Sequence, residues 1–464
     1  MTNPDAGALA TAADVKSGAA SALEITQAAL ERSESRNREI NAYTSLTRAR
    51  ALAEAAAIDA RRARGDTLPP LAGVPYAVKN LYDIQGEVTL AGSIINKTNP
   101  PAAQDALLVA RMRAAGAILI GATNMDEYAY GFTTENTHYG ATRNPHDRRR
   151  TAGGSSGGSA AVVAAGCVPL SLGSDTNGSI RVPASFCGLF GLKPTFGRLP
   201  RSGSFLFSAS LDHPGPFARS AADLAACYDV LQGPDPNDFA CSNRAAEATL
   251  PHLSQGIAGL RIAMAGGYFE QIAHPEALAA RDLVARALGA DKTVIVPEAA
   301  RARSSAYLIT AAEAAAQHFA NLKTRAADFE PLNRDRLLAG ALIPALWILQ
   351  AQRFRAWYRS RMLELFRDID ILLAPATPFA APLLGTETGI VNGKSVPLRP
   401  NIGLLTQPIS FIGLPVVAVP VWNAQLPIGV QVIAAPWKEG LALRVAAWLE
   451  KEGACRSPVA KDMN

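Results

Sequence analysis

Two stretches rich in glycine and serine have the residue types that nucleophilic catalysis requires. The first reads Gly-Gly-Ser155-Ser-Gly-Gly-Ser, and the second reads Gly-Ser-Asp-Thr-Asn-Gly-Ser179-Ile-Arg. A serine hydroxyl that attacks a carbonyl needs a base to take its proton and an oxyanion hole to hold the developing charge. Clustered glycines let backbone N–H groups converge on one point without side-chain clashes. The second stretch therefore predicts a turn that carries a nucleophilic serine.

Two other interpretations of these stretches are weaker. A flexible linker is rarely followed by a helix, yet the apolar run Ala160-Ala-Val-Val-Ala-Ala165 predicts one directly afterwards. A phosphate cradle would need the P-loop pattern or the dinucleotide-binding glycine pattern, and the sequence contains neither in the right context.

The base that would activate such a serine is predicted to be a lysine. The six histidines lie in no recognisable triad setting. A lysine can act instead if burial lowers its pKa until the amine is neutral near pH 7. Lys79 meets this condition by position, since it ends the apolar run Tyr76-Ala-Val78 beside a Gly-Val-Pro turn.

Together these motifs resemble the amidase signature family. The match includes Gly-Val-Pro-Tyr-Ala-Val-Lys79, the Ser155 stretch and Asp-Thr-Asn-Gly-Ser179-Ile-Arg-Val-Pro-Ala, in this order, and spans about residues 20–435. The resemblance implies a triad in which Ser179 is the nucleophile, Ser155 is a cis-peptide serine that relays the proton, and Lys79 is the base. It also implies an oxyanion hole made by four consecutive backbone N–H groups, those of Thr176, Asn177, Gly178 and Ser179.

The residues next to the predicted nucleophile include one departure from the family pattern. Asn177 stands where many members have a small glycine or alanine. Its side chain is expected to narrow the pocket or to add a hydrogen-bond donor near the substrate. Asp175 and Arg181 are expected to form a structural ion pair rather than to act on the substrate. Ser156 and Ser159 are expected only to fill the glycine-rich loop.

Within the family, the stretches Asn80-Leu-Tyr-Asp-Ile84 and Tyr128 to Asn136 are similar to those of members that act on a carboxylated biuret. This resemblance implies hydrolysis of an amide C–N bond in a small carboxylated ureide, through an acyl-enzyme, with release of ammonia. Arg336 lies in a stretch that resembles the place where relatives bind the substrate carboxylate, a task that suits a bidentate arginine. Tyr130 is the second candidate for substrate binding. Alternatively, Arg334 and Arg336 only pair with nearby acidic residues on a helix surface.

Other functions remain open at this stage. A broad-specificity aryl or aliphatic amidase is one, and the glutaminase subunit of the tRNA-dependent amidotransferase is another, although its signature usually continues Ser-Ile-Arg-Gln where this chain has Val182. A catalytically silent binding subunit is disfavoured, because the predicted lysine and both serines are present. No cofactor or metal is expected, since no His/Cys/Asp cluster has metal-ligand spacing.

The elements that must position these residues are predicted to form a single α/β domain. The 464 residues are 48% hydrophobic and 18% charged, which permits a sizeable core. Helical segments alternate with apolar strand segments, and this order predicts a large mixed sheet covered by helices on both faces. We expect one amidase signature domain over residues 1–464, with a core over about 20–435 and a helical insertion on the substrate side over about 303–368.

Charge and cysteine content bear on partners and location. The balance of 45 basic and 40 acidic residues, with 6% aromatic residues, argues against nucleic acid as a partner. The five cysteines lack CxxC spacing, no N-terminal signal pattern is visible, and no membrane-spanning apolar run occurs, so a cytoplasmic location is expected. The family resemblance implies a small helical subunit, resembling the small subunit of the tRNA-dependent amidotransferase, in a heterotetramer, or else a homodimer.

Overall fold

A mixed sheet of eleven strands runs through the molecule. The computed structural model describes residues 5–422 and 425–461. The strand order is β1-β3-β2-β8-β10-β9-β16-β17-β13-β11-β12, with parallel pairing of β2 to β3 and β8, and of β11 to β12 and β13. The strands are β1 (Tyr43–Leu46), β2 (Pro75–Lys79), β3 (Ile118–Thr123), β8 (Leu170–Asp175), β9 (Phe190–Lys193), β10 (His213–Ala218), β11 (Ile262–Gly266), β12 (Lys292–Ile295), β13 (Ile371–Pro375), β16 (Val416–Val421) and β17 (Ile428–Ala434).

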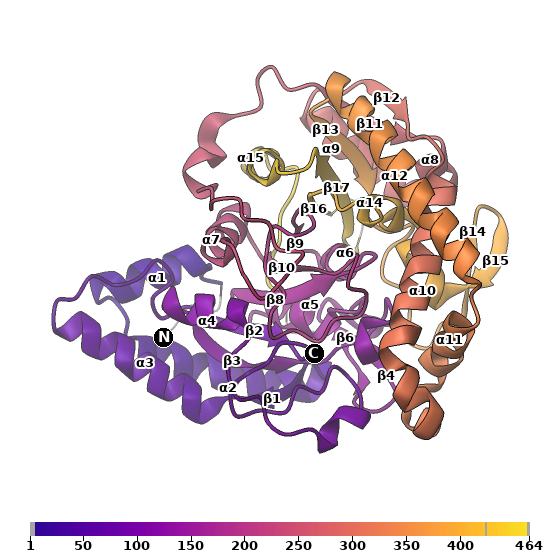
Figure 1. Ribbon diagram of the computed structural model, residues 1–464. Helices are drawn as coiled ribbons and strands as arrows, with labels where there is room; N and C mark the ends of the chain where they lie inside the picture. The colour runs from indigo at the N-terminus through magenta and orange to yellow at the C-terminus, as the bar shows by residue number, and fades with distance from the viewer. Residues whose placement is uncertain (1–4, 423–424, 462–464) are drawn as a thin grey trace.

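Helices cover both faces of this sheet (Figure 1). The alternating side chains of the strands explain this arrangement, because β2 turns Tyr76 and Val78 into one apolar core and Ala77 into another. The predicted fold, a mixed sheet between helices, is therefore confirmed. The longer helices are α1 (Ala8–Ser17), α2 (Ala22–Ile40), α3 (Arg48–Ala63), α4 (Leu107–Ala114), α5 (Gly157–Ala164), α6 (Arg181–Cys187), α7 (Ala221–Leu231), α9 (Pro275–Ala287), α10 (Ala299–Thr324), α11 (Pro331–Ala341), α12 (Ala345–Asp368) and α15 (Glu439–Lys451).

Two central strands were not anticipated from the sequence. β8 contains serine, glycine and aspartate, which are poor strand formers, and β10 reads His-Pro-Gly-Pro-Phe-Ala. Both strands nevertheless lie in the middle of the sheet, where β10 pairs antiparallel with β8 and with β9. Tertiary pairing on both sides overrides the local preference here, and it places the serine-rich end of β8 next to the end of β2.

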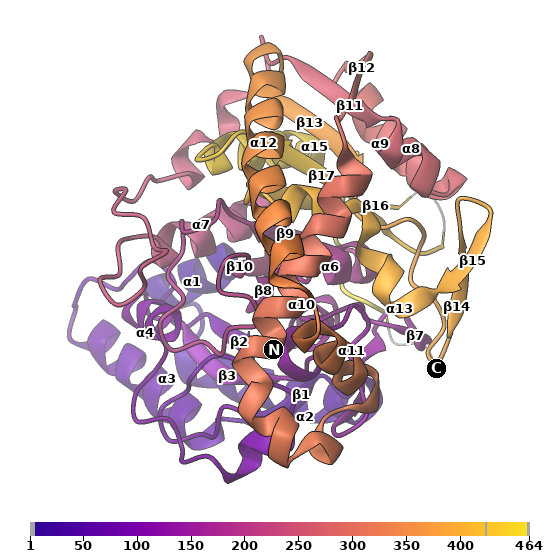
Figure 2. The same cartoon turned by 45° about the vertical axis from the view of Figure 1, so that its right-hand side comes forward.

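The region expected to be almost wholly helical forms three helices beside the sheet. α10 packs against both α11 and α12 along one side of the molecule (Figure 2). The chain breaks between them at two prolines, with Pro331 in the first turn of α11 and Pro344 directly before α12. Within the described residues no single helix is long and apolar enough to cross a membrane. Of the helices in this part of the chain, only α11 and α12 taken together, with a bend of 94° between them, reach that length and apolar composition.

Candidate active site

Lys79, the predicted base, is the last residue of β2 and is completely buried. Its Nζ donates hydrogen bonds to Ser155 Oγ at 2.7 Å and to Ser174 Oγ at 2.9 Å. The parallel pairing of β2 with β8 brings Ser174 close, and the loop before α5 supplies Ser155. The structure thus joins two of the three residues predicted from the sequence, and adds a serine that the sequence reasoning missed.

The environment of Lys79 favours the neutral amine. Burial lowers the pKa of Lys79 from 10.5 to about 7, against the opposing attraction of Asp126, Asp212 and Asp175. Desolvation dominates because a buried ammonium loses its hydration, whereas none of these carboxylates forms an ion pair with it among the described residues. A lysine with this pKa is half neutral near pH 7 and can accept a proton.

Ser155 lies in a tightly packed loop. The Gly154–Ser155 peptide bond is cis. A Cβ at Gly154 would stand 2.1 Å from Asp126 Oδ2, so this position has room only for glycine. The expectation that Ser156 only fills the loop is wrong, because its Oγ donates to the backbone oxygen of Ser174 and accepts from the Ser174 N–H. Ser159 has a similar role, donating to Leu172 O at 2.9 Å. The two serines fasten this loop and α5 to β8.

Ser179, the predicted nucleophile, lies in the short turn between β8 and α6 and is 3% exposed. Its Oγ forms no hydrogen bond with any residue in the described part of the chain. Gly178 has φ +141°, and a Cβ there would meet Thr406 Oγ1 at 2.2 Å. The turn therefore needs glycine on both conformational and steric grounds.

The predicted ion pair between Asp175 and Arg181 braces this turn. Arg181 Nη2 lies 2.9 Å from Asp175 Oδ1, and both side chains are fully buried. The second carboxylate oxygen of Asp175 accepts from the N–H of Ile180 at 3.2 Å. Burial alone would raise the pKa of Asp175, but Arg181 holds it well below its usual range. The ionised carboxylate fixes the backbone directly after Ser179, at Ile180 and Arg181.

The predicted oxyanion-hole residues occupy this same turn. The backbone N–H groups of Asn177, Gly178 and Ser179 donate to no residue in the described ranges. The side chains of Thr176 and Asn177 in this turn already form hydrogen bonds. The Thr176 hydroxyl donates to Asp212, and the Asn177 amide nitrogen donates to Thr310 Oγ1 at 3.0 Å. Free amides next to a nucleophile can stabilise an oxyanion.

Arg336 and Tyr130, the candidates for substrate binding, contact each other. Arg336 Nη1 donates to Tyr130 O at 3.1 Å, and the guanidinium carbon lies 3.5 Å from the centre of the Tyr130 ring. Arg334 does pair with an acidic neighbour, Asp335, at 3.0 Å. Among the described residues Arg336 has no such pair. The alternative of a surface ion pair therefore holds for Arg334 and not for Arg336.

A buried ion network, missed from the sequence, connects these two regions. Arg399 bonds Asp126 and Glu330, each at 2.9 Å, and both carboxylates are fully buried. Asp126 packs on Gly154 in the Ser155 loop, while Glu330 precedes the helix that carries Arg336. No sequence pattern joins residues so far apart along the chain. A metal site is not part of this network: among residues 5–422 and 425–461, no three His, Cys, Asp or Glu side chains are grouped to hold an ion.

Comparison with known proteins agrees with the sequence motifs. The profile of the Amidase family matches residues 24–443. The chain belongs to the amidase signature family. Within it, the chain is 58% identical to AtzE of Pseudomonas sp. (strain ADP), a 1-carboxybiuret hydrolase subunit, over 95% of this chain and 97% of that protein. It is 37% identical to a glutamyl-tRNA(Gln) amidotransferase chain of Koribacter versatilis (strain Ellin345), over 95% of this chain and 97% of that one.

A solved structure is similar to this chain in both sequence and fold. It is described as "An unexpected vestigial protein complex reveals the evolutionary origins of an s-triazine catabolic enzyme" and is 56% identical, with a TM-score of 0.97 over 98% of this chain and 100% of that chain. As a member of the amidase signature family, this chain is a hydrolase that acts on amide C–N bonds.

Proposed function

We propose that this amidase hydrolyses a C–N bond of a small carboxylated ureide, 1-carboxybiuret, and releases ammonia. The observation that carries the proposal is the 58% identity to the 1-carboxybiuret hydrolase protein AtzE over 95% of the chain. Arg336 gives physical support, because an arginine without a carboxylate partner among the described residues has its charge available for a carboxylated substrate.

The proposed chemistry uses Ser179, Ser155 and Lys79. Ser179 Oγ attacks the carbonyl carbon while its proton passes to Ser155, whose own proton moves to the neutral amine of Lys79. The N–H groups of residues 176–179 stabilise the oxyanion of the tetrahedral intermediate. When the intermediate collapses, the C–N bond breaks and the proton on Lys79 returns through Ser155 to the leaving nitrogen, which departs as ammonia. Water then attacks the acyl-enzyme by the same proton path and regenerates Ser179.

Ammonia release from a small substrate panel tests this proposal. The panel comprises 1-carboxybiuret, glutamine and an aromatic amide, measured with the purified chain. The largest kcat/KM is expected for 1-carboxybiuret. A preference for glutamine would identify the glutaminase activity of the tRNA-dependent amidotransferase instead, and similar rates on all three would identify a broad amidase.

We further propose that a small helical subunit covers the outer surface of α11 and α12. Nine of the thirteen large apolar side chains that are exposed in the described part of the chain lie between Phe319 and Leu363. They include Leu342, Leu346 and Leu349, each more than 60% exposed. Soluble proteins rarely leave so much apolar surface uncovered in one place.

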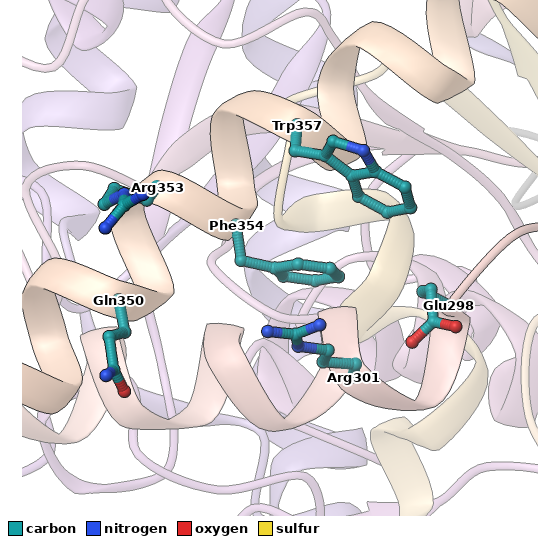
Figure 3. Close-up of a pocket in the computed structure, with 6 residues that line it drawn as sticks. All are labelled: Glu298, Arg301, Gln350, Arg353, Phe354 and Trp357. Carbon is teal, nitrogen blue, oxygen red and sulfur yellow. The ribbon is translucent and has the colours of Figure 1, made fainter.

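The charge of this surface favours a different, acidic partner over a second copy of the chain. Figure 3 shows the hollow between α10 and α12, where Arg301 lies under Phe354, with its guanidinium carbon 4.5 Å from the ring centre, and Arg353 stands at the rim. α12 as a whole carries five arginines and two acidic residues, a net charge of +3, and Glu298 is an acidic residue that also lines the hollow. In a two-fold dimer the positively charged surface of α12 would face the same surface of the second copy, and the two would repel each other. An amphipathic helix with acidic residues would instead complement this charge.

Solubility and light scattering test the partner proposal. The chain expressed alone is expected to be poorly soluble or to self-associate, and Leu346→Gln with Leu349→Gln should relieve this while leaving kcat/KM unchanged. Leu383→Gln, at an exposed leucine on another part of the surface, is the matched control. A soluble, fully active monomer would contradict the proposal, and a stoichiometric dimer that Leu346→Gln dissociates would identify a homodimer.

We also propose a cytoplasmic location. All five cysteines are free, and four of them are buried. Unpaired thiols are typical of reducing compartments. Cell fractionation with an antibody to the chain tests this, and recovery from the periplasm or the membrane would contradict it.

A further inference from the structure

The side chain of Asn177, in the turn that carries the proposed nucleophile, has an unused hydrogen-bond acceptor. Asn177 is two residues before Ser179 and is 7% exposed. Its backbone oxygen accepts from Thr406 Oγ1 at 2.6 Å, so the position of the residue is held from the start of α14 (Gln407–Ser410) as well as from α10. Its Oδ1 is buried and has no hydrogen-bond partner in the described residues.

The hydrogen bonds around Thr310 engage the nitrogen end of the Asn177 amide and leave its oxygen unused. The Thr310 hydroxyl donates to the backbone oxygen of Ala306 at 2.8 Å, one turn earlier in α10. Its single proton is then committed, so it can only accept from Asn177. In this arrangement the Nδ2 group of Asn177 faces Thr310, at 3.0 Å, and the carbonyl oxygen is the free end. The expectation of an additional donor near the substrate is replaced by an acceptor.

A buried acceptor without a donor destabilises the unliganded protein and is rare in folded chains. A glycine or alanine at this position would avoid this penalty. A substrate that supplied an N–H group there would remove the penalty on binding. Ureides differ from simple amides in this respect, because they carry an N–H, and not a CH2 group, on the acyl side of the scissile carbonyl.

We propose that Asn177 Oδ1 accepts a hydrogen bond from the acyl-side N–H of the substrate and so selects ureides over carboxylic amides. The inference rests on the proposed ureide hydrolysis and identifies the group that recognises the ureide. Asn177 is a specificity-determining residue in this scheme, whereas Arg336 binds the carboxylate at the other end of the substrate.

A matched pair of compounds isolates this contact. N-carbamoylglycine and succinamate both carry a terminal carboxamide and a carboxylate at the same spacing, and they differ only in the replacement of NH by CH2. The dissociation constant of each is measured calorimetrically with the Ser179→Ala variant, which does not turn the compound over. The expected result is tighter binding of N-carbamoylglycine by about tenfold or more, because succinamate leaves Oδ1 unpaired.

Asn177→Gly in the same background provides the decisive comparison. It should abolish the preference by weakening N-carbamoylglycine about tenfold while succinamate changes little, because only the ureide uses Oδ1. Thr310→Val leaves the acceptor in place but removes the group that orients it, so an intermediate preference is expected. The inference is overturned if Asn177→Gly weakens the binding of both compounds equally, which would indicate a structural role. It is also overturned if the Ser179→Ala variant with Asn177 in place binds both compounds equally well.

The outcomes also separate this inference from the proposed function. Turnover of 1-carboxybiuret by the otherwise unchanged chain together with equal binding of the two compounds overturns only the role of Asn177. Failure to turn over 1-carboxybiuret, with retained preference for N-carbamoylglycine, overturns the named substrate and leaves the ureide contact in place. Binding of neither compound overturns the contact as well.

Discussion

The pKa of Lys79 leads to a quantitative prediction for the pH dependence of hydrolysis. With a pKa of about 7, the neutral fraction of the amine is about a tenth at pH 6, about half at pH 7 and about nine tenths at pH 8. The value of kcat/KM is therefore expected to rise about tenfold between pH 6 and pH 8 and then to level off. A lysine with the ordinary pKa of 10.5 would instead give a tenfold rise per pH unit up to about pH 10.

Removal of a nearby carboxylate tests the electrostatic origin of this pKa. Asp126 is the strongest of the three carboxylates that oppose the effect of burial. Asp126→Asn should lower the pKa of Lys79 further, since it removes a negative charge that favours the ammonium form of Lys79. The midpoint of the acid limb should move below pH 7. Asp147→Asn is the matched control, because Asp147 pairs only with Arg149 and Arg150 among the described residues.

The assay is ammonia release at constant ionic strength from pH 5.5 to 9.5, with kcat/KM determined at each pH for the three proteins. A midpoint near pH 7 that falls in Asp126→Asn and is unchanged in Asp147→Asn agrees with the reasoning. A rise that continues beyond pH 9, or a midpoint that moves upwards in Asp126→Asn, would refute it.

The same pKa also affects the free energy of unfolding. Between pH 7 and 10.5 the unfolded chain binds a proton on Lys79 that the folded chain does not, so this residue makes stability rise with pH across that window. Below pH 7 both states carry the proton, and the folded state bears the full penalty of a buried ammonium. Lys79→Met should therefore raise the free energy of unfolding more at pH 6 than at pH 10, as measured by urea denaturation. An equal effect at both pH values would show that the pKa is not lowered.

Three further outcomes are expected. Ser179→Ala and Lys79→Ala should each lower kcat by at least about a thousandfold with an unchanged circular dichroism spectrum, and Ser155→Ala should do so less severely; retention of more than about a tenth of kcat by Lys79→Ala would contradict the triad. Arg336→Leu should raise KM for a carboxylated ureide about a hundredfold, equivalent to about 2–3 kcal/mol, and leave a neutral amide nearly unaffected. Arg334→Leu is its matched control. EDTA should leave the rate unchanged, and a loss that zinc restores would argue for a metal-dependent reaction.

The local sequence alone predicted the residues whose chemistry depends on type and spacing. Ser179 and its flanking glycine could be recognised because tight turns and converging amides require glycine at particular positions. The role of Ser155 was predicted only from the resemblance to the amidase signature family. Lys79 could be recognised because an unpaired lysine at the end of an apolar strand is costly unless it is neutral. The alternation of helices and apolar segments was sufficient to predict a mixed sheet between layers of helices.

Only the tertiary structure revealed the partners of those residues. Ser174 lies close to Lys79 because β2 pairs with β8. These two strands are far apart in the sequence, and no local sequence pattern indicates that they pair. Arg399 meets Asp126 across an even longer separation. The free acceptor of Asn177 depends on a hydroxyl in α10 whose proton is used within its own helix. Such hydrogen bonds depend on distances between side chains in space, and sequence spacing carries no information about those distances until the strands are paired and the helices are packed.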